Sequence, residues 1–175
     1  KMGNLLQGKV AIVTGSGRGV GRGVAHLMAE EGASVVIVDP GVNVDGSGYD
    51  QSIAEQVASE IRDAGGNAVA CTESVTTMQG GETIIQTAID NFGKLDIVVT
   101  CAGILRDRMI FNMSEQEWDD VIAVHLKAPL PSLSMLPLFS DNSGLAGSLP
   151  SVLSQDWWEI LARLIMELLN PVSLD

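Results

Sequence analysis

Five glycines at alternate positions, from Gly15 to Gly23, have the spacing that points most directly to chemistry in this sequence. An apolar run, residues 9–14, precedes them, and a segment with helical periodicity follows. The first N–H groups of a helix lack partners and carry the positive end of its dipole, so they attract anions. Glycines let a phosphate approach the backbone. The spacing Gly15-x-x-x-Gly19-x-Gly21 therefore predicts a pyrophosphate site, whereas Gly-x-Gly-x-x-Gly fits in no register.

Asp39 ends the second apolar run, residues 34–39. A carboxylate in this place accepts hydrogen bonds from the ribose hydroxyls of an adenosine and repels a 2′-phosphate. Arg18 could attract that phosphate, but Asp39 is expected to lie nearer the ribose. Together the loop and the acid predict a dinucleotide site that prefers NAD to NADP. The alternative is a glycine-rich turn that serves only tight packing of strand against helix.

Apolar runs and helical segments alternate along the first 127 residues. Strands are expected at 9–14, 34–39, 67–72 and 95–103, and helices at 20–32, 49–66, 80–93 and 114–127. Ser114 and Glu117 form a capping box at the start of the last of these helices. Short connections between such elements imply right-handed crossovers. The fold class predicted is α/β, a Rossmann-like doubly wound parallel sheet of strand order 3-2-1-4, truncated after about four strands, plus a C-terminal helix.

The sequence changes character near residue 128 and predicts three segments. Residues 1–127 are expected to form an NAD-binding half domain. Residues 128–153, rich in Pro, Ser and Leu, are expected to be an irregular connector. Residues 154–175 are expected to form an amphipathic helix with an apolar stripe of Trp157, Ile160, Leu161, Leu164, Ile165 and Leu168.

Composition excludes several classes of partner. A net charge of −12 without a basic stripe argues against nucleic acid and against an anionic membrane surface. No apolar run reaches about 18 residues, so no membrane span is expected. Cys71 and Cys101 lack metal-ligand spacing and indicate reduced thiols in a cytoplasmic protein without a leader. A small-molecule substrate is a possible partner, and an exposed sheet or the terminal helix would support a homo-oligomer.

Two motifs resemble the short-chain dehydrogenase/reductase family. "TGSGRGVG", residues 14–21, is similar to its Thr-Gly-x-x-x-Gly-x-Gly signature, and "VTCAGI", residues 99–104, is similar to its Asn-Asn-Ala-Gly strand. The insert after Asp39, residues 64–77 and residues 102–127 resemble the (3R)-hydroxyacyl-CoA dehydrogenase domains of multifunctional β-oxidation enzymes. His125 also resembles that branch, because most of the family has Asn at this position. The resemblance covers residues 5–127.

This resemblance implies roles for particular residues. The pyrophosphate would lie on the glycine loop, and Asp39 would hold the adenosine ribose. Ser74 and Val75 would flank the adenine, and His125 would take the place of the Asn that orders a proton-relay water. The residues implied at the cofactor are Gly15, Arg18, Gly19, Val20, Gly21, Asp39, Ser74, Val75, Cys101, Ala102, Gly103 and Ile104, the last four along the nicotinamide ribose.

Two departures from the family put activity in doubt. Thr100-Cys101 replaces Asn-Asn, which predicts some loss of order there. The family's catalytic Ser and Tyr-x-x-x-Lys are also absent. The one tyrosine, Tyr49, has Ile53 four residues on, and neither Tyr nor Lys follows Lys127. A truncated or altered gene product would give this pattern.

Two functions follow as hypotheses. The first is an NAD-dependent oxidoreductase of an alcohol or ketone such as a 3-hydroxyacyl-CoA, impaired by the missing residues. The second is a non-catalytic dinucleotide-binding or interaction module. His125 could replace the missing tyrosine as an acid–base, or it could only support the site. Residues 106–109 could contact an anion such as CoA phosphate, or they could form a solvated loop.

Overall fold

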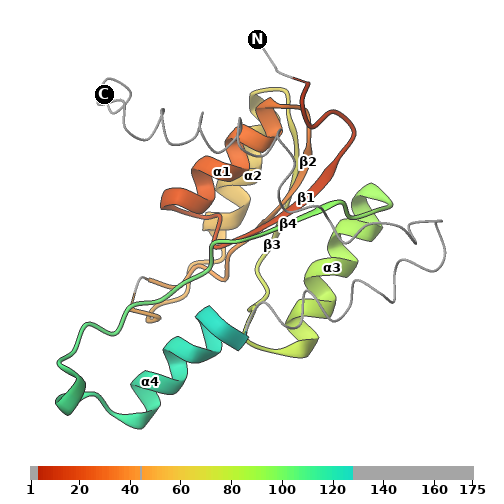
Figure 1. The fold of residues 1–175 in the computed structure, drawn as a ribbon. Coiled ribbons are helices and arrows are strands. Elements are labelled where there is room, and N and C mark those ends of the chain that lie inside the picture. The colour runs from red at the N-terminus through yellow and green to blue at the C-terminus, as the bar shows by residue number, and fades with distance from the viewer. Residues whose placement is uncertain (1–3, 44, 128–175) are drawn as a thin grey trace, which may run out of the picture.

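The computed structural model describes residues 4–43 and 45–127 (Figure 1). The predicted connector at 128–153 and the predicted helix at 154–175 lie outside the described residues. The account below therefore concerns the half domain that carries the glycine loop.

Four parallel strands form the sheet: β1 (Val10–Thr14), β2 (Ser34–Val38), β3 (Asn67–Cys71) and β4 (Ile97–Thr100). Their order is β3-β2-β1-β4, which confirms the order predicted from the sequence. Thr14 pairs with Val38 on one side and Thr100 on the other, and Val38 pairs with Cys71. The carboxyl ends of all these strands therefore meet at one edge of the sheet, where ligands of such folds bind.

Helices alternate with the strands. They are α1 (Gly19–Glu30), α2 (Ser52–Asp63), α3 (Met78–Phe92) and α4 (Glu115–Ile122), with a short 3₁₀ turn, η1 (Ile110–Asn112), before α4. The segment after β4 runs away from the sheet and returns as α4 (Figure 1). The single helix predicted for residues 114–127 ends as an α-helix at Ile122 and continues as one π-helical turn, η2 (Ala123–Lys127).

Alternating strand residues fill two cores, one on each face of the sheet. Val13 and Ile37 pack with α1 and α2, whereas Ile12 and Val36 pack with α3. Figure 1 shows α1 and α2 together on one face and α3 on the other. The continuous apolar runs of β1 and β2 follow from this arrangement, because a central parallel strand is buried on both faces.

β4 differs from the other strands in burial. Ile97, Val98 and Val99 are only half-buried, and Thr100 is exposed. β4 is therefore less buried than the three other strands. In the described part of the chain β1 is its one neighbour, so its other edge has no strand beside it.

Helix ends follow local chemistry. The helix predicted from residue 49 begins at Ser52, because the Asp50 carboxylate accepts the Ser52 N–H (3.0 Å) and turns the chain there. Gly93 ends α3 with a φ of 77°. The predicted capping box is present, since Ser114 Oγ accepts the Glu117 N–H and the Glu117 carboxylate accepts the Ser114 N–H.

Ser16 joins β1 to β2 from inside the glycine loop. Its side chain is fully buried, its Oγ donates to the Val13 carbonyl (2.7 Å), and it accepts the Val38 N–H (2.9 Å). A buried donor without a partner costs more than an ordinary hydrogen bond contributes. The hydroxyl therefore stabilises the level strand ends on which the site is built.

We predict that Ser16→Ala lowers the free energy of unfolding by about 1–3 kcal/mol, because the two buried hydrogen bonds of the hydroxyl, to the Val13 carbonyl and from the Val38 N–H, are lost. Denaturant unfolding followed by circular dichroism measures this. Thr83→Ala on α3 is the matched control: the Thr83 hydroxyl is exposed and donates only to the Gln79 carbonyl of its own helix. Its effect should stay within about 0.5 kcal/mol, and equal losses in both variants would contradict the role given to Ser16.

Candidate dinucleotide site

The backbone amides of the glycine loop divide into two groups. The Gly15 and Ser16 N–H groups donate to the Val38 carbonyl (2.8 and 3.3 Å), and the Gly17 N–H donates to Asp39 Oδ2 (2.9 Å). In the described part of the chain, nothing accepts from the amides of residues 18–21. Those amides stand at the start of α1, where the helix dipole favours an anion.

Glycine is required in this loop where backbones approach closely. A Cβ on Gly21 would lie 2.2 Å from the Gly15 carbonyl oxygen. A Cβ on Gly15, whose φ is +65°, would lie 2.7 Å from the Ala102 backbone. A Cβ on Gly19 would meet nothing within 4 Å, so the space above the start of α1 is open. The loop thus packs tightly on its inner side and leaves its outer side free.

The Asp39 carboxylate faces the glycine loop. Its Oδ2 accepts from Gly17, and its Oδ1 accepts the Gly41 N–H (2.8 Å). A carboxylate has about four lone-pair positions, so acceptor capacity for two ribose hydroxyls is left. A Cβ on Gly17 would lie 2.7 Å from Asp39 Oδ2, so this contact also needs glycine.

The segment after Asp39, residues 40–43 and 45–50, is called the ribose loop below. Arg18 of the glycine loop reaches it, since Arg18 Nη1 donates to the Val42 carbonyl (3.2 Å). Arg18, Gly19 and Val20 are all exposed. Three of the residues expected at the pyrophosphate are therefore accessible, whereas Gly21 is buried. The Gly15 N–H is already used by β2, so Gly15 contributes room rather than a donor.

Ser74 and Val75 follow β3 at the same edge of the sheet. Val75 is buried in the core under α3, and Ser74 Oγ lies 2.9 Å from Thr76 Oγ1. A Cβ on Gly80 would lie 2.0 Å from the Ser74 carbonyl oxygen, so α3 packs directly on this segment. The structure thus places both residues at the carboxyl edge, where the adenine was expected.

Residues 101–104 continue β4 past the end of β1. The Cys101 N–H donates to the Thr14 carbonyl (3.2 Å), and the Ala102 N–H donates to Thr14 Oγ1 (3.3 Å). These bonds hold the segment at the glycine loop although Cys replaces the family's Asn. Burial raises the pKa of the Cys101 thiol, which therefore stays protonated and packs as a small apolar side chain.

His125 contacts the same segment from η2. Its Nε2 lies 3.1 Å from the Ile104 nitrogen and 2.9 Å from the Ile104 oxygen. It accepts from the N–H in one tautomer and donates to the carbonyl in the other. A Cβ on Gly103 would lie 2.8 Å from His125 Cε1, so the ring packs on bare backbone. The geometry is that of a side chain that positions residues 103–104.

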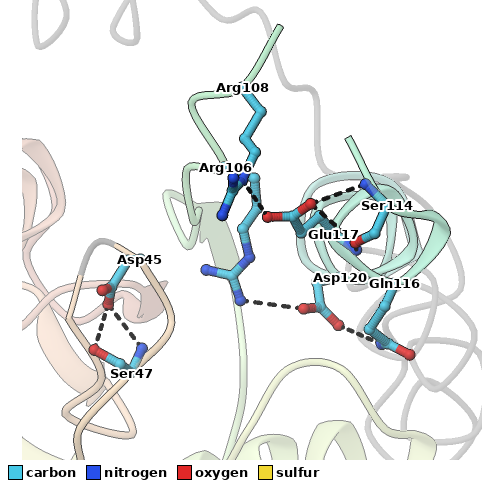
Figure 2. Close-up of polar contacts among 8 residues, drawn as sticks. All are labelled: Asp45, Ser47, Arg106, Arg108, Ser114, Gln116, Glu117 and Asp120. Atoms are coloured by element: carbon cyan, nitrogen blue, oxygen red, sulfur yellow. Dashed lines mark hydrogen bonds and ion pairs between the residues drawn. The ribbon is translucent and has the colours of Figure 1, made fainter. Parts of the chain in front are cut away.

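Other residues considered from the sequence do not join this site. Tyr49 is 64 % exposed on the ribose loop, and its Oη accepts from Gln51 Nε2 (2.8 Å). Arg106 pairs with Asp120, and Arg108 pairs with Glu117 (Figure 2). Both guanidinium groups are neutralised by carboxylates of α4, which favours the structural role over a contact for CoA phosphate.

Two hydroxyl groups at this edge were missed by sequence reasoning. Ser16 occupies a variable position of the glycine motif, and Thr14 is the first residue of the motif, to which the sequence assigns no contact. Both hydroxyls join strand ends. A small polar residue at the end of an apolar run is therefore the sequence feature that could have identified them.

Within residues 4–43 and 45–127, no group of His, Cys, Asp and Glu could hold a metal, and no helix is long and apolar enough to cross a membrane.

Comparison with known proteins identifies the family. The family described as short chain dehydrogenase matches residues 9–148. The chain belongs to the short chain dehydrogenase family. The match continues past Lys127, so it extends further than the resemblance predicted from the motifs.

Curated relatives agree with this assignment. The peroxisomal multifunctional enzyme type 2 of Drosophila melanogaster is 45 % identical over 157 residues, which is 83 % of this chain and 26 % of that protein. The hydroxyacyl-CoA dehydrogenase ChsB1 of Mycobacterium tuberculosis is 43 % identical over 122 residues, 70 % of this chain and 37 % of that enzyme. The chain thus spans well under half the length of these relatives.

Solved structures share the fold. A short chain dehydrogenase from Mycobacterium avium has a TM-score of 0.72 at 44 % identity, covering 83 % of this chain and 51 % of its own. A 7α-hydroxysteroid dehydrogenase in complex with NADH and 7-oxo glycochenodeoxycholic acid has a TM-score of 0.66 at 32 % identity, covering 75 % of this chain and 48 % of its own.

We predict that Gly21→Ala lowers the free energy of unfolding by about 1–3 kcal/mol, because the added methyl group collides with the Gly15 carbonyl. Thermal unfolding of Gly23→Ala is the control. A Cβ on Gly23 meets nothing within 4 Å, and alanine in a helix interior is favourable by up to about 1 kcal/mol. A Gly21→Ala variant as stable as the parent would show that the loop is not packed as described.

Proposed function

We propose that this site binds NAD and that the chain belongs to an oxidoreductase that acts on an alcohol or ketone such as a 3-hydroxyacyl-CoA. One observation carries the proposal. The amides of residues 18–21 have no acceptor in the described part of the chain, and they lie beside a carboxylate, Asp39, at the carboxyl edge of a parallel sheet.

The residues present fit a dinucleotide. The free amides and the start of α1 would hold the pyrophosphate, and the open space at Gly19 admits it. The unused lone pairs of Asp39 would accept from the adenosine ribose, and residues 101–104 would lie along the nicotinamide end. When bound, the cofactor supplies the hydride donor or acceptor, while the protein supplies binding and orientation.

The preference for NAD over NADP rests on charge. A 2′-phosphate on the ribose would lie next to the Asp39 carboxylate, and two like charges at such a distance repel by about 1 kcal/mol or more. The solved relative that contains NADH supports a nicotinamide dinucleotide. Arg18 is turned toward the Val42 carbonyl, which leaves the carboxylate unopposed at the ribose.

The substrate class rests on the relatives. The mycobacterial relative is a hydroxyacyl-CoA dehydrogenase, and it covers 70 % of this chain. We extend that class to this chain as part of the proposal. A cytoplasmic location, a small-molecule substrate and homo-oligomer formation through the sheet or the terminal helix stay predictions from the sequence.

Hydride transfer by these 175 residues alone is proposed to be impaired. The family's proton donor is a tyrosine, and the one tyrosine, Tyr49, is exposed on the ribose loop and has Ile53 rather than Lys four residues on. His125 contacts only the Ile104 backbone among the described polar groups. This favours, as a second candidate function, a dinucleotide-binding module without catalysis.

We predict that NADH binds at least about tenfold more tightly than NADPH, because the 2′-phosphate meets the Asp39 charge. Fluorescence titration measures both dissociation constants. Asp39→Ser should weaken NADH binding and reduce the preference for NADH to about threefold or less.

Asp63→Ser is the charge-matched control. Asp63 ends α2, so it lies at the edge of the sheet opposite the glycine loop. It should leave both constants unchanged. Equal affinity of the parent chain for the two cofactors, or no binding of either, would contradict the proposed function.

Turnover separates the two candidate functions. NADH formation is followed by absorbance while a 3-hydroxyacyl-CoA is oxidised with NAD, in the parent chain and in His125→Ala. Binding of NADH without turnover supports the module. Turnover that His125→Ala abolishes supports an enzyme in which histidine takes part in proton transfer.

A further inference from the structure

Arg106 lies where three parts of the chain meet. It follows β4, its Nη2 donates to Asp120 Oδ2 of α4 (3.1 Å), and its side chain is 22 % exposed (Figure 2). The same guanidinium covers the turn at Gly46 of the ribose loop. A Cβ placed on Gly46 would lie 3.3 Å from Nη2 and 3.5 Å from Nη1. The planar group therefore packs close to the backbone of this turn.

Hydrogen bonds within the ribose loop connect the turn at Gly46 to the Asp39 carboxylate. The Asn43 N–H donates to the Ser47 carbonyl (2.7 Å), which closes the loop near its tip. The Asp50 N–H donates to the Gly41 carbonyl (3.0 Å), which closes it at its base. The Gly41 N–H donates in turn to Asp39 Oδ1. The position of the tip is thereby linked to the position of Asp39.

The charges around Arg106 hold it in place. A hydrogen bond from Ser47, with a smaller contribution from the Arg106 charge, lowers the pKa of Asp45. Hydrogen bonds from Gln116 and then from Arg106 lower the pKa of Asp120. The guanidinium is thus paired directly with a carboxylate of α4, and its charge also acts on a carboxylate of the loop. This arrangement disfavours an added anion and favours a structural clamp.

We infer that Arg106 is a positioning residue for cofactor binding: anchored by Asp120, its guanidinium supports the turn at Gly46 and holds the ribose loop beside Asp39. Arg18 holds the other side of the loop through the Val42 carbonyl. Two arginines, one from the glycine loop and one from the segment after β4, therefore contact the loop that adjoins the adenosine ribose. The inference rests on the proposed function, since it assigns Arg106 to the adenosine half of that site.

A positioning role predicts a loss confined to one half of the cofactor. If Arg106→Ala leaves the loop in place about one tenth of the time, the dissociation constant for ADP-ribose rises about tenfold. Binding of reduced nicotinamide mononucleotide, which lacks the adenosine, should stay unchanged. Calorimetric or fluorescence titration of the full chain with each probe measures this split. A general loss of structure would weaken both probes.

Arg108→Ala is the matched control. Arg108 belongs to the same segment and pairs with Glu117 of the same helix, but it is 58 % exposed, and among the described residues it has no hydrogen bond or ion pair with the ribose loop. It should leave ADP-ribose binding unchanged.

Hydrogen–deuterium exchange tests the clamp without any cofactor. Amides of residues 41–43 and 45–50 should exchange faster in Arg106→Ala than in the parent chain or in Arg108→Ala. Asp120→Asn, a milder change, should act in the same direction if Arg106→Ala does not fold. Unchanged loop exchange, equal weakening of both probes, or equal effects of the two arginines would overturn the inference. Faster loop exchange in a chain that binds neither probe would support the clamp and contradict the proposed function.

Discussion

The end of β2 decides which amides of the glycine loop are left for a ligand. The Val38 carbonyl takes the N–H groups of Gly15 and Ser16, and the Asp39 carboxylate takes that of Gly17. The next amides, residues 18–21, find no acceptor in the part of the chain that the structure describes. Because the strands end level at one edge, this division places free donors and a carboxylate within one short stretch of backbone. The remaining features of the site depend on it.

Close backbone packing keeps this division in place. Gly21 lies against the Gly15 carbonyl, and Gly15 lies against Ala102, so α1, β1 and the end of β4 are held at distances that no side chain permits. Hydroxyls of Thr14 and Ser16 satisfy groups that this packing would otherwise bury without partners. Farther from the sheet, two arginine side chains contact the ribose loop: Arg18 at the Val42 carbonyl and Arg106 at the turn of Gly46. Near the sheet the site is therefore held by packed backbone, and farther from the sheet it is held by side chains.

Much of this arrangement could be predicted from the sequence, because it depends on local pattern. Apolar runs gave the strands and their order, and the spacing of glycines placed the loop at the start of a helix. Asp39 followed from its position at a strand end. The role of Arg106 could not be predicted, since its partner Asp120 is 14 residues away and its other contact, Gly46, comes from a different connection. The half-burial of β4 and the π-helical turn that brings His125 to Ile104 are also tertiary features that no local period encodes.

Backbone amide exchange measured by nuclear magnetic resonance tests the central division most directly. In the free chain, the amides of Gly15, Ser16 and Gly17 should be protected, and those of residues 18–21 should exchange rapidly. Addition of NAD should shift and protect the second group while leaving the first group nearly unchanged. Protection of residues 18–21 in the free chain, or no response of these amides to NAD, would contradict the account.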